Sequence, residues 1–288
     1  MNLYSPKTIK QTLKEHNSSP KDHLGQNFLV EKRVASALLR AAELSGRDTV
    51  LEVGPGMGTL TQELAGAAGL VIAVEKDPVM VEILKETVVK EHPNVKVLQG
   101  DILKMKFQAA NSEVSIVNGQ LSNVSYRVVA NLPYYITSPV LRMFLEAEKK
   151  PELLALMVQK EVAQRICAKP PDMSMLAVST QFYAVPKIIA YVRKTAFWPR
   201  PKVDSAIVKI VPNKEKPVVA PDTFFRVVKA GFKQPRKQLA NNLATELNLS
   251  RQETESLLKK ADIKPEQRAE TLSLKDWINL AKEYTMGK

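Results

Sequence analysis

The pattern of apolar and polar positions alternates between strand-like and helix-like stretches from residue 31 to residue 211. Helical periodicity covers 31–44, 59–68, 78–91 and 139–148, and β-rich runs cover 49–53, 70–75, 95–98, 127–130, 153–158, 187–194 and 203–211. This alternation predicts a mainly parallel sheet covered by helices on both faces. A short loop joins the last two runs, so we expect an antiparallel hairpin at the sheet edge.

The stretches outside this alternation predict the domain organisation. Residues 1–30 are polar and lysine-rich, and we interpret them as an arm or cap. Residues 111–125 are rich in Asn and Ser, which is typical of a loop or small insertion. Prolines punctuate residues 212–221, and helical periodicity with little β signal follows. We therefore predict an arm at 1–30, a catalytic domain at 31–213 and a small all-helical domain at 214–288.

A glycine cluster follows the first predicted strand and precedes a helix. Gly54, Gly56 and Gly58 are three of only 11 glycines in the chain. Such a turn at the carboxyl edge of a parallel sheet is where these folds bind ligands, because glycine lets the backbone approach a ligand closely. The dinucleotide fingerprint would need a further glycine where Thr59 stands, so NAD fits poorly.

Two carboxylates end the next two predicted strands. Glu75 lies 21 residues beyond Gly54 and can accept the hydroxyls of a ribose. Asp101 follows the third strand, where it can accept the amino group of an adenine. S-adenosylmethionine has a ribose, an adenine and a cationic sulfonium but no phosphate, so an acidic pocket suits it. We therefore predict a site for S-adenosylmethionine.

The fourth predicted strand ends in Asn131-Leu132-Pro133-Tyr134. The amine of adenine is a poor nucleophile, because its lone pair is delocalised into the ring. The Asn131 side-chain oxygen and the Leu132 carbonyl could accept its two hydrogens and hold the nitrogen in line with a methyl group. Tyr134 could stack on the flipped base, and Phe197 is a candidate for a second wall.

Composition points to a nucleic-acid partner. The 288-residue chain has a net charge of +12, which favours a polyanion. The one cysteine and three scattered histidines lack zinc-site spacing, so we predict no metal. Neither a signal peptide nor an apolar run of transmembrane length is evident, so we expect a cytoplasmic protein.

A basic cluster marks the predicted helical domain. The twelve-residue segment 226–237 contains no acidic residue. Its basic residues are Arg226, Lys229, Lys233, Arg236 and Lys237. The spacing predicts several of these on one helical face, with Pro235 bending or ending the helix. Residues 187–216 hold a second basic concentration. Both suit contact with phosphates.

Several motifs together resemble those of the ribosomal RNA adenine dimethyltransferase family of the KsgA type. The matches run in order from residue 24 to residue 206, and a weaker match continues over 232–243. They are Leu24-Gly25-Gln26-Asn27-Phe28-Leu29, Glu52-Val53-Gly54-Pro55-Gly56-Met57-Gly58-Thr59-Leu60-Thr61, Val74-Glu75-Lys76-Asp77, Gly100-Asp101-Ile102-Leu103, Asn131-Leu132-Pro133-Tyr134-Tyr135-Ile136-Thr137-Ser138-Pro139, Val158-Gln159-Lys160-Glu161-Val162-Ala163-Gln164-Arg165 and Pro201-Lys202-Val203-Asp204-Ser205-Ala206.

This resemblance implies a Rossmann-like, seven-stranded S-adenosylmethionine-dependent methyltransferase domain followed by a small helical domain. It implies transfer of four methyl groups to two adjacent adenines in the 3′-terminal hairpin loop of 16S (small-subunit) rRNA, within an assembling 30S subunit. The enzyme is expected to be a monomer with no membrane partner. By matching position, the cofactor contacts are Asn27, Leu29, Gly54, Glu75, Asp101 and Asn131.

Three alternatives share some of these features. A 23S rRNA adenine methyltransferase of the macrolide-resistance type has the same fold, but its site usually reads Asn-Ile-Pro-Tyr-Asn. A non-catalytic RNA-binding assembly factor could keep the fold, although intact Glu75, Asp101 and Asn131 argue for activity. A DNA adenine methyltransferase would need a target-recognition domain, which the helical tail does not resemble.

Overall fold

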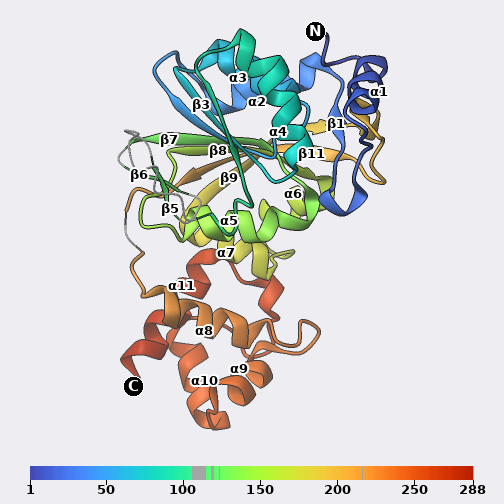
Figure 1. Cartoon of the computed structure of the whole chain (residues 1–288). Helices are drawn as coiled ribbons and strands as arrows, with labels where there is room; N and C mark the ends of the chain where they lie inside the picture. Colours follow the sequence, from blue (N-terminus) through green and yellow to red (C-terminus); the bar gives the residue numbers. More distant parts are fainter. Residues whose placement is uncertain (106–114, 118–119, 123, 216, 288) are drawn as a thin grey trace. The chain divides into compact units, whose positions relative to one another are not determined.

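The computed structural model describes residues 1–105, 115–117, 120–122, 124–215 and 217–287, drawn in Figure 1. The chain divides into two compact units. One comprises Met1–Ala163 and Lys187–Pro212, and the other comprises Gln164–Pro186 and Asn213–Lys288. The second unit therefore includes residues 164–186 in addition to the C-terminal stretch that the sequence pattern assigned to a helical domain.

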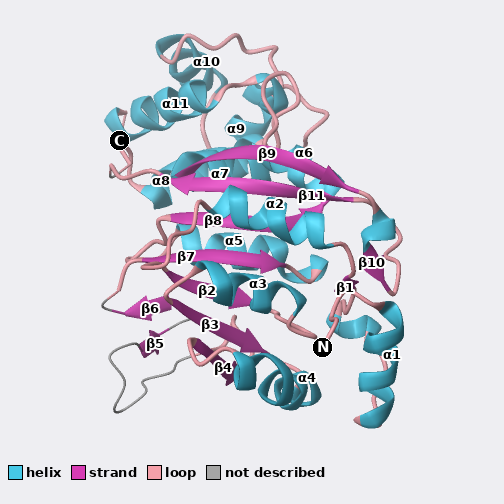
Figure 2. Cartoon of the chain, turned by 90° about the horizontal axis from the view of Figure 1, so that it is seen from above, coloured by secondary structure: helices cyan, strands magenta, loops and turns pink. Residues whose placement is uncertain are grey.

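A seven-stranded sheet forms the centre of the first unit, in the order β4-β3-β2-β7-β8-β11-β9 (Figure 2). The first five strands of this order are parallel, and β11 pairs antiparallel with β8. The expected neighbours β9 and β11 lie side by side with their arrows opposed, and β9 is the edge strand. The strands are β2 (Thr49–Val53), β3 (Leu70–Glu75), β4 (Val95–Gln99), β7 (Tyr126–Asn131), β8 (Leu153–Gln159), β9 (Ala184–Val192) and β11 (Ser205–Pro212).

Helices cover the sheet, with α2 and α3 on one side and α5 on the other (Figure 1). The central strands are buried along nearly their whole length, as expected for a parallel sheet between helices. The predicted helix over 78–91 is α4 followed by a π-helical turn at Lys85–Val89, packed close to Gly58. The helices that begin in this unit are α1 (Pro6–Glu15), α2 (Lys32–Ala42), α3 (Thr59–Ala67), α4 (Pro78–Leu84), α5 (Thr137–Leu145) and α6 (Lys160–Ile166).

The N-terminal segment is folded onto the first unit. Its helix α1 is capped by Ser5 and buries Ile9 and Leu13 in a small core beside Phe28, Met57 and neighbouring side chains. The segment then forms β1 (Phe28–Leu29), which pairs antiparallel with β10 (Phe197–Trp198). Only the lysine-rich face of α1 is exposed, which explains why composition alone suggested a polar arm.

The predicted insertion at 111–125 lies partly outside the described residues. Its described part is not a simple loop, because β5 (Ser115–Val117) and β6 (Gln120–Ser122) pair antiparallel. A polar stretch of this kind can form two paired strands although its sequence lacks the alternating apolar pattern by which strands are usually predicted.

The second unit is helical, apart from the start of β9. Phe182 of α7 stacks on Phe224 of α8 with ring centroids 3.9 Å apart, which explains why residues 164–186 belong to this unit. Trp277 of α11 is fully buried and stacks on Phe232. The helices are α7 (Met175–Tyr183), α8 (Pro221–Gly231), α9 (Leu239–Leu247), α10 (Arg251–Lys260) and α11 (Leu274–Met286). Within the described ranges, no helix has both the length and the apolar composition needed to cross a membrane.

Candidate cofactor and substrate site

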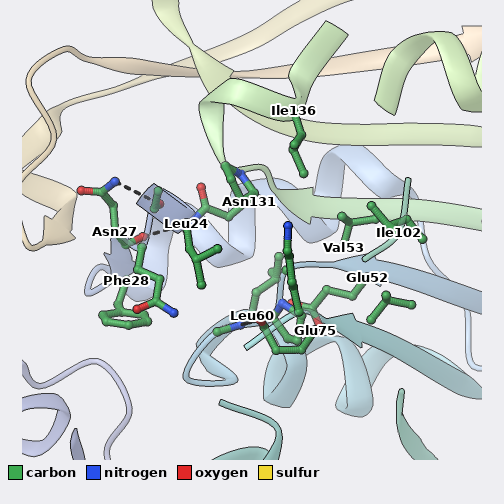
Figure 3. A pocket seen from close by; sticks show the side chains of 18 of the residues that line it. Leu24, Asn27, Phe28, Glu52, Val53, Leu60, Glu75, Ile102, Asn131 and Ile136 are labelled. Carbon is green, nitrogen blue, oxygen red and sulfur yellow. Dashed lines mark hydrogen bonds between the residues drawn. The ribbon is translucent and has the colours of Figure 1, made fainter. Parts of the chain in front are cut away.

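A pocket lies where β2, β3, β4 and β7 end, and the N-terminal segment covers one side of it (Figure 3). Parallel strands bring these ends to one edge, so residues far apart in sequence meet there. The predicted residues that line it are Asn27, Leu29, Gly54, Gly56, Glu75, Asp101 and Asn131. The pocket is also lined by Glu52, Lys76 and Tyr135, to which the sequence analysis assigned no role.

The glycine loop shapes the floor of this pocket. Gly54, Gly56 and Gly58 have φ angles of 68°, 56° and 84°, a region that L side chains rarely adopt. A Cβ atom at Gly56 would lie 3.3 Å from the ring of Phe28. Glycine at this position therefore serves two needs, because it permits the turn and leaves room for Phe28.

Glu75 is held by the backbone of two neighbouring loops. Its Oε2 accepts a hydrogen bond from the Gly56 N–H at 3.0 Å, and its Oε1 accepts one from the Asp77 N–H at 2.8 Å. Burial raises the pKa of Glu75, although these backbone donors oppose the shift. The carboxyl group is thus fixed in orientation at the end of β3.

A second carboxyl group, Glu52, lines the pocket one strand away. It is 1% exposed, and its Oε2 has no hydrogen-bond partner among the described residues. The pKa of Glu52 is raised to about 8, chiefly by burial; Thr61 opposes the shift, and the nearby Glu75 adds to it. A buried acceptor without a partner costs free energy, so a pocket with this group favours a ligand that carries a donor or a positive charge.

Asp101 faces the same pocket in an ion pair. Lys76 Nζ lies 3.0 Å from Asp101 Oδ2, and both residues line the cavity. A second Asp101 oxygen, Oδ1, accepts from the backbone N–H of Leu103. The predicted acceptor for an adenine amino group is therefore already engaged by a neighbouring ammonium group.

Asn131 points its side chain into the pocket from the end of β7 (Figure 3). Its Nδ2 donates to the backbone carbonyl of Asn27 at 3.2 Å, and Asn27 Nδ2 donates to the carbonyl of Gly25. No described residue donates to Asn131 Oδ1. Because the amide nitrogen is held by the N-terminal segment, the oxygen is the atom left to accept a hydrogen bond from a substrate.

The other predicted substrate residues do not line this pocket. Leu132 is 2% exposed, and its N–H donates to the Met157 carbonyl. Tyr134 is half-buried with its hydroxyl 2.8 Å from Ser205 Oγ, and burial raises its pKa. Phe197 is 4% exposed within the main core. In place of these rings, the structure exposes 54% of Tyr135 at the pocket.

A buried aspartate ties the N-terminal segment to the pocket. Asp77 is 1% exposed and accepts from Lys21 Nζ and Gln26 Nε2, both at 2.8 Å. Its burial opposes ionisation, but these donors and the Val79 N–H outweigh burial and lower the pKa of Asp77. The Asp77 N–H in turn donates to Glu75. The N-terminal segment is therefore attached to the turn that directly follows Glu75 at the end of β3.

The predicted basic cluster is only partly helical. Helix α8 ends at Gly231, so Arg226 and Lys229 lie on it, whereas Lys233, Arg236 and Lys237 lie in the following loop. The expectation of one shared helical face is therefore wrong, and the helix ends earlier than Pro235. All five side chains are exposed. Lys233 forms an ion pair with Glu246 at 3.7 Å, and Arg226 lies over the Tyr284 ring.

Comparison with known proteins gives one consistent family. The family model for ribosomal RNA adenine dimethylase matches residues 17–286. The ribosomal RNA small subunit methyltransferase A of Dehalococcoides mccartyi is 46% identical over 278 residues, which cover 96% of this chain and 92% of the relative.

Two solved structures have a similar fold. A dimethyladenosine transferase from Plasmodium falciparum is 24% identical, with a TM-score of 0.75 over 90% of this chain and 97% of that one. The 23S rRNA methyltransferase ErmE is 26% identical, with a TM-score of 0.70 over 89% of this chain and 99% of that one.

Proposed function

The chain belongs to the ribosomal RNA adenine dimethylase family, and on that basis we propose that it dimethylates the N6 amino groups of two adjacent adenines in the 3′-terminal hairpin loop of 16S rRNA. It is an S-adenosylmethionine-dependent rRNA adenine dimethyltransferase. The proposed setting is the cytoplasm, where a monomer acts late in assembly of the 30S subunit. The observation that carries the proposal is the convergence of Gly54, Glu75, Asp101 and Asn131 on one pocket.

The pocket residues fit S-adenosylmethionine. Glu75 offers a fixed carboxylate for the ribose hydroxyls, and Asp101 can accept from the adenine amino group once Lys76 yields its place. The unpartnered Oε2 of Glu52 suits a ligand with cationic groups. No phosphate-binding arrangement of lysines or arginines lines the cavity, because Lys76 is its only cationic side chain in the described lining.

The chain supplies positioning for the transfer. S-adenosylmethionine provides an electrophilic methyl group when it is bound. Asn131 Oδ1 accepts a hydrogen from the target amine, and the Leu132 carbonyl would accept the other if the substrate reaches it. Two such acceptors keep the nitrogen lone pair directed at the methyl group, and positioning of this kind can lower a barrier substantially. The product cation loses its proton without a strong base.

The basic residues of the second unit support a subunit-binding role. The exposed side chains of Arg226, Lys229, Arg236 and Lys237 can neutralise phosphates, and each such contact adds to affinity and to its salt dependence. We propose that residues 214–288 bind rRNA, while residues 31–213 carry the chemistry and residues 1–30 complete the cofactor site.

The test is methyl transfer from radiolabelled S-adenosylmethionine to unmethylated small subunits and, separately, to large subunits. Primer extension on the labelled RNA then locates the modification. We expect label only in the small subunit, at two adjacent adenines near the 3′ end. Label in the large subunit alone would favour the 23S activity suggested by the similarity to ErmE, and binding without label would favour a non-catalytic assembly factor.

A further inference from the structure

A groove outside the cofactor pocket combines an aromatic ring with cationic side chains. It lies between α1, the loop that follows it and the short strand β10, all within the first unit. Its apolar surface is formed by Leu13 and Trp198, and Lys10 and Lys14 stand beside them. The remaining lining residues are Asn17, Ser18, Ser19 and Pro20.

The lysines share one face of α1. Lys7, Lys10 and Lys14 follow the i, i+3, i+7 spacing that aligns side chains along a helix, and all three are exposed. Among the described residues, none of them forms an ion pair with an acid. Helix α1 therefore presents a row of unneutralised ammonium groups next to Trp198. Lys10 makes a cation–π contact with this tryptophan, with its Nζ 5.4 Å from the centroid of the Trp198 ring.

Trp198 connects this groove to the cofactor pocket. Its ring stacks on Phe28 with centroids 6.5 Å apart and planes inclined by 23°, and β1 pairs Phe28 directly with Trp198. Phe28 lines the cofactor pocket on the glycine-loop side. The Phe28 ring thus lies between the groove and the cofactor pocket. At this separation, the groove could hold a nucleotide that neighbours the reacting base.

We propose that this groove is a second RNA-binding site, in which Trp198 stacks on an unpaired base beside the target adenines and Lys7, Lys10 and Lys14 bind the adjoining phosphates. The inference rests on the proposed rRNA substrate. A tryptophan face accepts any base, and exposed ammonium groups follow a phosphate backbone. Lys10 has a flexible stem, so its ammonium group can leave the ring for a phosphate when a base arrives.

The first test uses the intrinsic fluorescence of the protein. The chain has two tryptophans, and Trp277 is fully buried, so a base that stacks on the surface quenches Trp198 alone. Titration with a short single-stranded oligoadenylate should quench the wild type and leave Trp198→Phe unquenched. Equal quenching in that variant would overturn the proposal, as would equal quenching of the wild type by polyglutamate, which would indicate an acidic protein partner.

The second test measures binding and methylation of unmethylated small subunits. Trp198→Ala should raise the Kd and KM at least about fivefold with little change in kcat, whereas Trp198→Phe should stay near the wild type. Lys10→Ala/Lys14→Ala should lower the slope of log Kd against log salt by roughly 1 to 2. The matched control is Lys96→Ala/Lys149→Ala, which removes the same charge from exposed positions of the same unit.

The outcomes distinguish the proposed RNA-binding groove from the proposed rRNA substrate. If the Lys10/Lys14 variant and the control lose equal affinity, the groove is only part of a general positive field and the proposal fails. If Trp198→Ala does not fold, the lysine pair and the fluorescence titration decide. If the wild type quenches with oligoadenylate but does not methylate small subunits, the groove stands as an RNA site and the proposed substrate is wrong.

Discussion

Asn131 illustrates how a single amide can be prepared for catalysis before a substrate arrives. Its Nδ2 is held by the Asn27 carbonyl, a residue 104 positions away in the chain, so the orientation of Oδ1 depends on the N-terminal segment. An amide that had to rotate into place during the reaction would lose part of its effect, because preorganised groups cost no reorganisation.

Asn131→Ala should reduce kcat by about 100-fold or more, since it removes a positioned acceptor, while the affinity for small subunits changes little. Single-turnover methyl transfer and calorimetry measure the two effects. Ser138→Ala, at an exposed position just beyond the site, is the control. Near-normal transfer by the Asn131 variant would remove Asn131 from the catalytic machinery.

Glu52 makes the stability of the free protein depend on pH in an unusual direction. Burial raises its pKa from 4.5 to about 8, so between these values the unfolded chain has released a proton that the folded chain retains. Stability therefore falls as pH rises through this window, and the penalty is complete above the folded pKa.

Glu52→Gln should flatten this dependence and raise the free energy of unfolding at pH 8 by more than about 1 kcal/mol. Denaturant unfolding at pH 5 and pH 8 without cofactor measures the difference. Glu91→Gln, at an exposed position where no described residue forms an ion pair with it, should leave the pH dependence as in the wild type. A Glu52 variant that kept the wild-type slope would assign that slope to another group.

At the residue scale, the sequence predicted the side chains that end strands and missed those that depend on packing. Gly54, Glu75 and Asp101 were found because a parallel sheet aligns its carboxyl ends. Glu52 was missed because its position within a strand suggests nothing about an unpartnered oxygen. The exposure of Tyr135 in place of Tyr134 follows from the hydroxyl contact with Ser205, which no local pattern reveals.

The N-terminal segment is the element whose role was hardest to see. Its first helix has few apolar positions, and its two-residue strand β1 is too short for a periodic signal. The cofactor contacts at Asn27 and Leu29 were expected only from the family resemblance. The structure places both residues in the pocket lining, and the bonds of Lys21 and Gln26 to the buried Asp77 hold the segment that precedes them.

Asp77→Asn should loosen this attachment, because it replaces charge-assisted hydrogen bonds with neutral ones. We expect a loss of about 1–3 kcal/mol in the free energy of unfolding and a roughly tenfold rise in the Kd for S-adenosylmethionine. Thermal unfolding and calorimetry measure these quantities, with Glu82→Gln on the exposed side of α4 as the control.

The contribution of Asp77 to the free energy of unfolding changes with pH in the opposite direction to that of Glu52. The pKa of Asp77 is lowered below its ordinary value of 3.8, so its contribution is present above that value and is lost as pH falls through the folded pKa. The difference in stability between wild type and Asp77→Asn should therefore shrink in acid. A constant difference down to the acid transition would contradict the ion-pair explanation.

At the scale of the whole molecule, the strand and helix order was predictable, because the apolar period changes clearly between elements. The extent of the second unit was not, since residues 164–186 look like a continuation of the first. Their place is decided by aromatic packing between α7 and α8, which are separated by β9 to β11 in the chain.

The second unit should contribute affinity for the subunit without affecting the chemistry. Arg236→Ala/Lys237→Ala should raise the Kd for small subunits and lower its salt slope by roughly 1 to 2, with kcat at saturation unchanged. Filter binding across a salt series measures this. Lys259→Ala/Lys260→Ala, a pair of exposed lysines on α10, is the control, and an equal response of both pairs would argue against a specific contact.

The aromatic stack of Phe182 on Phe224 also limits how this protein can be divided. The chain enters the helical unit, leaves it to complete the sheet with β9 and β11, and then returns. A truncation after Pro212 would therefore not release an intact catalytic unit, because residues 164–186 would lose their apolar partners and expose Phe182 and Tyr183 to water. Separating the activities of the two units calls for point substitutions rather than deletion of the C-terminal residues.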